Sequence, residues 1–185
     1  MVVNNRLGLI FTLMFLFPPC AIAEDWNHWR GPNFNGSIGS GNPPSSWSAE
    51  NNIVWRQEIP GKGSSTPIVV EGHVYLMSTV DTGKDAGGQT VAQSSDSGGR
   101  GMSNPKPTSV HDYLVLAYDL STGREIWRRT LTSAVPHEGG HPTNTFASGS
   151  LATDGQRLIA NFGSQGIYAL DMEGGKLWSR DLGKM

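Results

Sequence analysis

The chain has 185 residues and a formal net charge of −2, with 14 basic and 16 acidic side chains. This balance provides no basic surface of the kind that nucleic-acid binding requires, so we expect no nucleic-acid partner. The 24 Gly and 11 Pro, together with the lack of any long helical periodicity, exclude a helical bundle and predict an all-β chain with many turns.

The first 23 residues have the pattern of a secretory signal peptide. Arg6 supplies a positive charge, residues 7–17 form an apolar run, and residues 21–23 (Ala-Ile-Ala) form a small-x-small cleavage pattern. The alternative is a membrane anchor, but a spanning helix needs roughly 20 apolar residues and this run is shorter. We predict cleavage before Glu24, no membrane span, and a secreted, periplasmic or cell-envelope location.

Cys20 is the only cysteine, and it lies inside this N-terminal segment. Lipidation at Cys20 would require a small residue directly before it, and Pro19 occupies that position, so the lipoprotein alternative is disfavoured. Cleavage would leave a mature chain without a thiol. Disulfides, cysteine nucleophiles and cysteine metal ligands are then excluded.

Residues 24–50 are rich in Gly, Pro, Asn and Ser and carry four spaced aromatic side chains, Trp26, Trp29, Phe34 and Trp47. This composition predicts an extended arm that crosses a surface and is fixed there by its aromatic side chains. Residues 51–185 are expected to form the folded domain.

Alternating apolar residues begin at 53–59, which predicts a strand containing Trp55. The runs 65–70 and 73–77 flank Glu71-Gly72 and predict a hairpin with a two-residue turn. The polar segment 82–112 has too few apolar residues to build a core, so we expect a disordered surface loop there.

The same order of elements returns later in the chain. Residues 148–153 and 157–162 flank Asp154-Gly155, which favours a type I′ turn with positive φ at both central residues. Third strands are predicted at 113–119 and 166–171. Each unit is therefore expected to have four short antiparallel strands.

Two segments that follow the third strands are nearly the same. Residues 117–127 read Ala-Tyr-Asp-Leu-Ser-Thr-Gly-Arg-Glu-Ile-Trp, and residues 169–178 read Ala-Leu-Asp-Met-Glu-Gly-Gly-Lys-Leu-Trp. A period of about 50 residues is typical of repeat architectures in which each unit is one supersecondary element. The repeated side chains are Asp119, Gly123 and Trp127 in the first copy and Asp171, Gly175 and Trp178 in the second.

Each repeated residue type has a structural role. The aspartate accepts hydrogen bonds from backbone amides just ahead of it in an Asx turn, and the glycine takes a positive φ. The tryptophan offers a flat face for stacking on the adjacent unit. These features predict a β-propeller of four-stranded antiparallel blades, here about two blades plus one extra strand.

The pattern Ala-x-Asp-x-x-Thr-Gly-x-x-x-Trp resembles the PQQ-type, or quinoprotein, β-propeller repeat. Residues 26–32, 54–56 and 146–148 resemble secreted, planctomycete-type members of that family. The second copy departs from the pattern because Gly174 stands where the family has threonine. WD40 repeats fit less well, since the chain has no Trp-Asp dipeptide.

The resemblance implies a ring that two blades cannot close, because propellers have four to eight blades. We therefore expect an N-terminal fragment whose open side is covered by missing blades or protein partners. The alternative is that copies of this two-blade unit associate with one another to complete the ring. The resemblance implies a non-catalytic binding or scaffold module. The alternative is a fragment of a PQQ-dependent quinoprotein oxidoreductase, which would need calcium; many such enzymes also have a vicinal disulfide, which the mature chain lacks.

One loop carries four side chains that could bind a metal ion or another ligand: His137, Glu138, His141 and Asn144. Two imidazoles and a carboxylate are zinc ligands, and loops between strands often carry function. Gly139-Gly140 and Pro142, however, disfavour the helix that would bring the two histidines together. We therefore predict no metal site, no catalytic residue and no bound cofactor, and we keep these four residues as weak candidates for a ligand loop.

Overall fold

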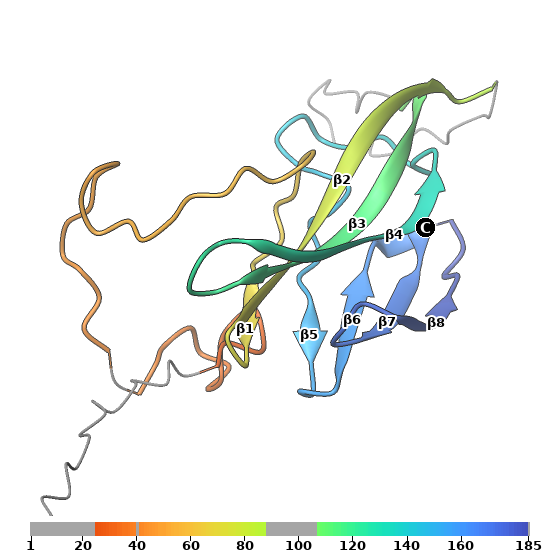
Figure 1. Ribbon diagram of the computed structural model, residues 1–185. Coiled ribbons are helices and arrows are strands. Elements are labelled where there is room, and N and C mark those ends of the chain that lie inside the picture. The colour runs from red at the N-terminus through yellow and green to blue at the C-terminus, as the bar shows by residue number, and fades with distance from the viewer. Residues whose placement is uncertain (1–24, 40, 88–106, 185) are drawn as a thin grey trace, which may run out of the picture.

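The computed structural model describes residues 25–39, 41–87 and 107–184, and it contains two four-stranded antiparallel sheets (Figure 1). In each sheet the strands are neighbours in sequence order. The first sheet contains β1 (Ile68–Val70), β2 (His73–Asp85), β3 (Ser109–Asp119) and β4 (Glu125–Ala134). The second contains β5 (Ala152–Thr153), β6 (Arg157–Asn161), β7 (Ile167–Asp171) and β8 (Lys176–Arg180), with a 3-10 turn η1 (Gly163–Gln165) before β7. The predicted all-β chain of two four-stranded units is confirmed.

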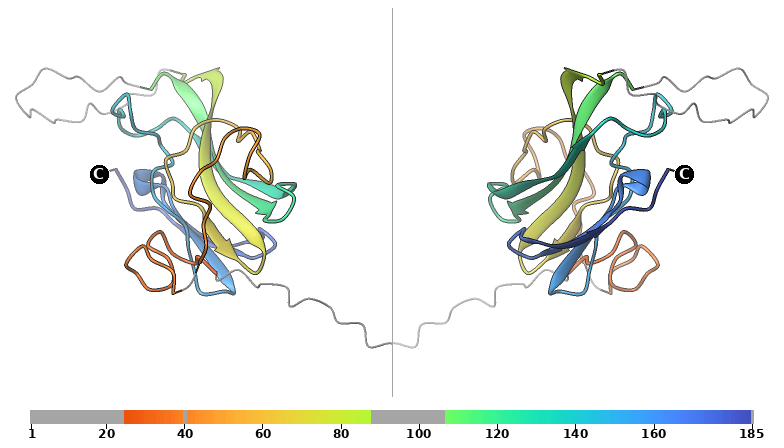
Figure 2. Two further views of the ribbon diagram at one scale, coloured as in Figure 1. Left: turned by 90° about the vertical axis from the view of Figure 1, so that its left-hand side faces the viewer. Right: turned by 90° about the vertical axis from the view of Figure 1, so that its right-hand side faces the viewer.

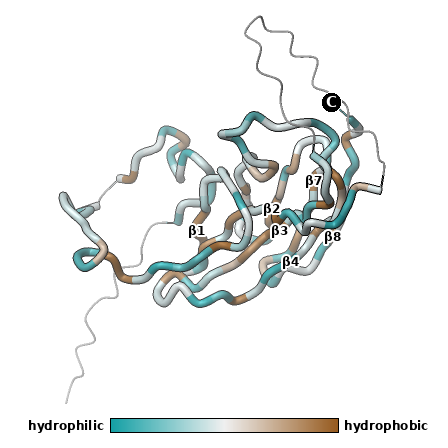
Figure 3. The backbone as a smooth tube through the Cα atoms, turned by 90° about the horizontal axis from the view of Figure 1, so that it is seen from above, coloured by the Kyte–Doolittle hydropathy of each residue, from teal (hydrophilic) through white to brown (hydrophobic). Residues whose placement is uncertain are grey.

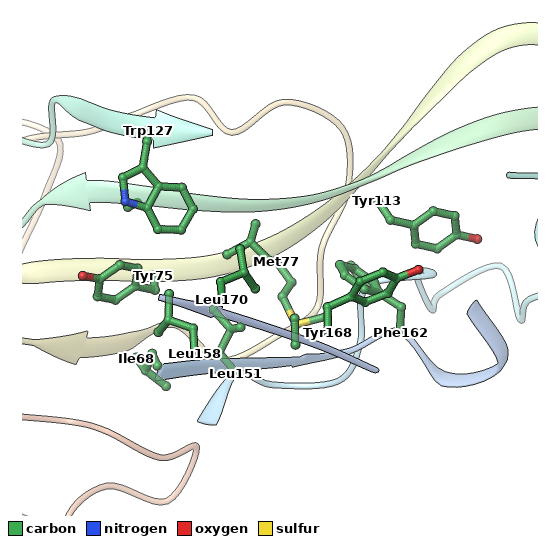
Figure 4. Packing of buried hydrophobic residues seen from close by; sticks show 14 of the residues in the cluster. Ile68, Tyr75, Met77, Tyr113, Trp127, Leu151, Leu158, Phe162, Tyr168 and Leu170 are labelled. Atoms are coloured by element: carbon green, nitrogen blue, oxygen red, sulfur yellow. The ribbon is translucent and has the colours of Figure 1, made fainter. Parts of the chain in front are cut away.

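The second sheet packs against one face of the first (Figure 2), and alternate residues of both sheets fill the space between them. Apolar residues concentrate along the strands (Figure 3). Figure 4 shows this inter-sheet core, whose buried members come from both sheets and from the loop between them. They are Ile68, Val70, Tyr75, Met77, Tyr113, Val115, Ala117, Trp127, Ala147, Leu151, Leu158, Ala160, Phe162, Tyr168 and Leu170. The period of two along β2 and β3 sends their other residues to the opposite face.

That opposite face of the first sheet is covered by residues 53–59, which do not form the predicted strand. Trp55 and Ile59 pack against a second cluster that includes Leu116 and Tyr118. The segment lies over the face of the sheet, where no strand edge offers backbone partners, so alternation of its side chains does not produce a ladder. The prediction of an extra strand at residues 53–59 is therefore wrong.

The arm preceding this segment is fixed at Trp26 but not by its other aromatic side chains. Trp26 exchanges backbone hydrogen bonds with Val69, at 2.7 and 2.9 Å. Trp29, Phe34 and Trp47 are 55%, 63% and 68% exposed, so the prediction that all four aromatics anchor the arm is wrong. Trp29 and Phe34 contact the ring of His28, the Arg30 guanidinium lies over Trp29, and none of the three exposed rings belongs to an apolar cluster of the sheets.

The two predicted hairpins differ in their turns. Glu71 and Gly72 have φ of 48° and 76°, as a type I′ turn requires. In the second hairpin only Gly155 has positive φ, so the type I′ prediction for Asp154-Gly155 is wrong. The Asp154 carboxylate accepts hydrogen bonds from the amides of Gln156 and Arg157 at 2.9 and 2.8 Å, which stabilises a longer turn.

The polar segment 82–112 begins and ends in strands. β2 continues to Asp85 and β3 starts at Ser109, because backbone pairing extends the ladder without needing apolar side chains. The Thr82 hydroxyl donates to the Val110 carbonyl at 2.7 Å within this extension. Residues 88–106, like the predicted signal peptide and Cys20, lie outside the described residues.

Trp127 of the first sheet lies on the turn between β7 and β8 of the second. Its indole N–H donates to the Met172 carbonyl at 3.1 Å, and its ring is so close to Gly174 that a Cβ there would be 2.9 Å from the indole. Gly174 has φ of 84°, a backbone conformation that residues with a Cβ atom rarely adopt. The predicted stacking of a repeated tryptophan on the adjacent unit is confirmed for Trp127.

The same contact occurs between Trp55 and the turn between β3 and β4. The Trp55 indole N–H donates to the Leu120 carbonyl at 2.7 Å, and a Cβ at Gly123 would be 2.5 Å from the ring. Each sheet thus receives an indole from the chain segment that precedes it. Trp178 of the last strand is 44% exposed, whereas Trp127 is 9% exposed.

The structure corrects one member of the repeated set, Gly175. The Asp119 amide donates to the Arg124 carbonyl, and the Asp171 amide donates to the Gly175 carbonyl, so Gly175 corresponds to Arg124. Gly174 takes the place of Gly123, with φ of 84° and 70° respectively. The second copy of the motif is one residue shorter than the first. Because Gly123 follows Asp119 by four positions and Gly174 follows Asp171 by three, the missing residue lies between the aspartate and the glycine.

Two glycines with nearly the same φ allow the contact with Trp127 to be tested. Gly174→Ala should lower the free energy of unfolding by about 2–4 kcal/mol, since it adds a clash with the indole to the cost of left-handed backbone. Gly155 has φ of 85°, and a Cβ added there would meet nothing within 4 Å, so Gly155→Ala should cost only about 1–2 kcal/mol. Urea unfolding of both variants measures the difference, and equal costs would contradict the contact.

Candidate functional site

The loop between β4 and β5 carries the four candidate residues, and the structure divides them between two cavities. His137 and Glu138 line a cavity of about 330 Å³, here called the Glu138 cavity. His141 and Asn144 line a cavity of about 490 Å³, here called the His141 cavity. The four side chains that are close in sequence therefore do not form one site.

The His141 end of the loop is held by its own hydrogen bonds. His141 Nδ1 lies 2.8 Å from the Thr143 hydroxyl, and the Asn144 amide donates to the His141 carbonyl at 2.8 Å. These contacts make a local turn in which both residues are exposed. Within residues 25–39, 41–87 and 107–184, no group of three or more His, Cys, Asp and Glu side chains is arranged to hold a metal ion.

The Glu138 cavity lies where the loop, the end of β6 and η1 meet β3. Gln165 of η1 donates a side-chain hydrogen bond to the Val135 carbonyl at 3.0 Å, which ties the loop to the second sheet. The Ser164 hydroxyl donates to Glu138 Oε2 at 2.6 Å and orients the carboxylate. Both sheets therefore contribute to the walls of this cavity.

Three polar atoms of residues that line the Glu138 cavity are buried and have no hydrogen-bond partner among the described residues. They are Glu138 Oε1, His137 Nδ1 and the Tyr113 hydroxyl. Nearly all buried polar groups in proteins are paired, because an unpaired one loses its hydration without compensation. All three have almost no accessible surface, so they lie behind the wall of the cavity and not on it.

Sequence reasoning identifies His137 and Glu138 but misses Tyr113 and Ser164. The strand pattern gives Tyr113 no role beyond the third strand, although a tyrosine in a buried strand needs a partner for its hydroxyl. Ser164 belongs to a short 3-10 turn that has no repeat signal. The phenol of Tyr113 is 1% exposed, so it faces the interior of the protein.

Burial determines the protonation state of Tyr113. Loss of hydration on burial, with the nearby Glu138 carboxylate and Tyr168 adding to it, raises the pKa of Tyr113 well above its ordinary value of 10.0. The phenol is therefore neutral throughout the physiological range and can both donate and accept a hydrogen bond.

The repeated aspartates close turns through their carboxylates, as predicted. Asp119 Oδ1 accepts hydrogen bonds from the amides of Ser121 and Thr122, at 3.0 and 2.8 Å, and from both hydroxyls, at 2.6 and 2.8 Å. The Asp171 carboxylate accepts one from the Gly175 amide at 2.6 Å. Both aspartates close the turn that receives an indole.

These bonds give the fold a dependence on acid. The hydroxyls of Ser121 and Thr122, with their amides, lower the pKa of Asp119 from 3.8 to about 2. A lowered folded-state pKa contributes stability that is fully present above about pH 4 and is lost as the pH falls towards 2. Asp119→Asn should therefore lower the unfolding midpoint near pH 7 more than near pH 2.

The matched control for this prediction is Thr122→Ala, which removes one donor and keeps the carboxylate. It should move the pH at which stability is lost upward, towards the ordinary aspartate range. Unfolding midpoints measured between pH 2 and 7 report both effects. The prediction is wrong if Asp119→Asn lowers the midpoint equally at every pH.

Comparison with known proteins agrees with this architecture. The family model described as outer membrane protein assembly factor BamB matches residues 45–185, a range that includes both sheets and the segment containing Trp55. No curated protein matches the chain. The described part of the chain contains no helix with the length and apolarity needed to cross a membrane. The chain belongs to the PQQ-type β-propeller repeat family that this assembly-factor model represents.

Proposed function

We propose that this chain is a non-catalytic binding module, a rigid section of β-propeller that acts outside the cytoplasm as a scaffold for protein partners. The observation that carries the proposal is the match of residues 45–185 to a family described by an outer membrane protein assembly factor. The outer membrane of that description and the N-terminal segment of the sequence both favour an extracytoplasmic location.

The packing of the sheets supports a scaffold role. Trp127 fixes the second sheet on the first, and Arg129 adds side-chain hydrogen bonds to the carbonyls of Gly174 and Glu173, at 3.0 and 3.3 Å. The loop between β4 and β5 lies at the same end of the molecule as the far end of β2 and β3, opposite the tight turns (Figure 1). A rigid support with longer loops at one end is the arrangement on which proteins commonly build binding surfaces.

The alternative, a PQQ-dependent oxidoreductase, requires a site for an anionic quinone and calcium. Calcium takes six to eight oxygen ligands, and PQQ carries three carboxylates. The Glu138 cavity is lined by no lysine or arginine, and its one carboxylate would repel such an anion. The His141 cavity offers one lysine, Lys62, and one carboxylate, Asp81. Neither of these two cavities has the oxygen ligands that calcium needs, and we derive no catalytic step.

A photo-crosslinking amino acid placed at each end of the molecule tests the scaffold proposal in cells. At Thr143, in the exposed loop between β4 and β5, it should give a discrete adduct with one envelope protein. At Gln156, in the exposed turn at the opposite end, it should give no adduct and so controls for accidental contacts.

Two results would contradict the proposal. One is the absence of a discrete adduct from the loop end, or equal adducts from both ends. The other is saturable, calcium-dependent uptake of PQQ by the full chain in an absorbance titration, which would favour the oxidoreductase.

A further inference from the structure

The N-terminal arm contains a compact loop at residues 28–36, here called the aromatic loop, which lies beside the turn between β1 and β2 (Figure 1). Its backbone is closed by hydrogen bonds from the Gly31 amide to the His28 carbonyl at 2.7 Å and from the Gly36 amide to the Arg30 carbonyl at 2.8 Å. These local bonds give the loop a defined shape.

The aromatic loop is attached to the first sheet through the residues that precede it. Trp26 pairs with Val69 of β1, and its ring is so close to Gly31 that a Cβ there would be 2.6 Å from the indole. The Asp25 carboxylate accepts a hydrogen bond from the Glu71 amide at 3.0 Å. The sheet therefore holds the base of the loop in place.

Two aromatic rings of the loop face solvent. Trp29 and Phe34 are 55% and 63% exposed. Both contact the ring of His28, with centroids 6.0 and 4.9 Å away, so the three rings form one patch. Apolar side chains gathered on a surface mark sites of interaction with proteins or membranes.

Phe34 is held in a strained backbone conformation. Its φ is 55°, in the left-handed region that bulky side chains rarely adopt. Such strain persists only where the surrounding structure enforces it, and it is concentrated at functional sites. Because the exposed ring contributes nothing to the core of the sheets, its retention at this position indicates a role in binding.

The charges of the arm favour a membrane surface. Residues 26–49 contain no Asp or Glu, although the chain has 16 acidic residues. The Arg30 guanidinium lies over the Trp29 ring, 5.4 Å from its centroid, so a cation accompanies the apolar patch. Tryptophan and arginine side chains are both favoured at the boundary between lipid headgroups and hydrocarbon, and anionic headgroups attract the guanidinium.

We propose that the aromatic loop is a membrane-contact surface, in which Trp29 and Phe34 enter the interfacial region of a bilayer and Arg30 contacts an anionic lipid headgroup. The loop between β4 and β5 then faces away from the bilayer, because it lies at the opposite end of the molecule from the tight turns (Figure 1). This surface needs lipid and no protein partner, so its test is independent of the scaffold proposal.

Co-sedimentation with vesicles of phosphatidylcholine and phosphatidylglycerol tests the surface. The protein is purified from cells after its own processing, so that the apolar run of residues 7–17 does not contribute. Trp29→Ala and Phe34→Ala should each weaken binding several-fold, because each removes a ring from the interface. Trp178→Ala removes a 44% exposed indole outside the loop and should leave binding unchanged.

Two results would overturn the proposal. One is equal weakening by all three substitutions, which would mean that any exposed ring adheres to lipid. The other is no binding of the unsubstituted protein to these vesicles. A discrete protein adduct from a photo-crosslinking amino acid at Phe34, without vesicle binding, would assign the loop to a protein partner instead.

Arg30→Gln tests the headgroup contact. The substitution should weaken binding to vesicles that contain phosphatidylglycerol and change binding to pure phosphatidylcholine vesicles little, because it removes the attraction to anionic lipid. Added salt should reduce the difference between the two kinds of vesicle. Equal weakening on both kinds would contradict the role of Arg30.

Phe34→Gly separates binding from folding. Glycine adopts a positive φ without strain, so the unfolding midpoint should be unchanged or higher, while vesicle binding weakens as much as in Phe34→Ala. A ring that only stabilises the arm would behave in the opposite way, with a lower midpoint and unchanged vesicle binding. That result would contradict the role of Phe34.

Discussion

The contact between the Trp127 indole and the turn at Gly174 is the constraint on which the arrangement of the two sheets depends. A four-stranded sheet of this size cannot bury both faces alone, so its stability comes from the neighbour on which it packs. The indole fixes the distance and the angle of that packing, because the glycine leaves no space for a shift. Trp55 makes the same contact on the other side of the first sheet, at Gly123.

The position of the Glu138 cavity follows from this constraint. The inter-sheet core runs from Trp127 and Tyr75 at one end to Tyr113 and Phe162 at the other (Figure 4). The indole contacts the turn at Gly174 at one end, whereas the loop between β4 and β5 lines a cavity of about 330 Å³ at the far end.

The repeated motif is sufficient to predict the architecture, because the aspartate and glycine form a turn between strands and the tryptophan of one unit contacts the turn of the next. It does not place the second glycine correctly, since a deletion within a turn can be aligned before or after Gly174 and only the backbone φ distinguishes the two. The Glu138 cavity is predictable only in part. Proximity in sequence suggests one site for His137 and His141, while the meeting of Glu138 and Tyr113 in one cavity depends on how the sheets pack, which no local pattern contains.

A double-mutant cycle between Trp127→Ala and Gly174→Ala tests the central contact most directly. If the methyl group at Gly174 destabilises the fold because it meets the indole, removal of the indole should relieve most of that cost. The unfolding free energies should then show a coupling of at least about 1 kcal/mol, above the roughly 0.5 kcal/mol expected for independent sites. Additive effects of the two substitutions would contradict the account, because they would mean that the indole does not determine how the sheets pack.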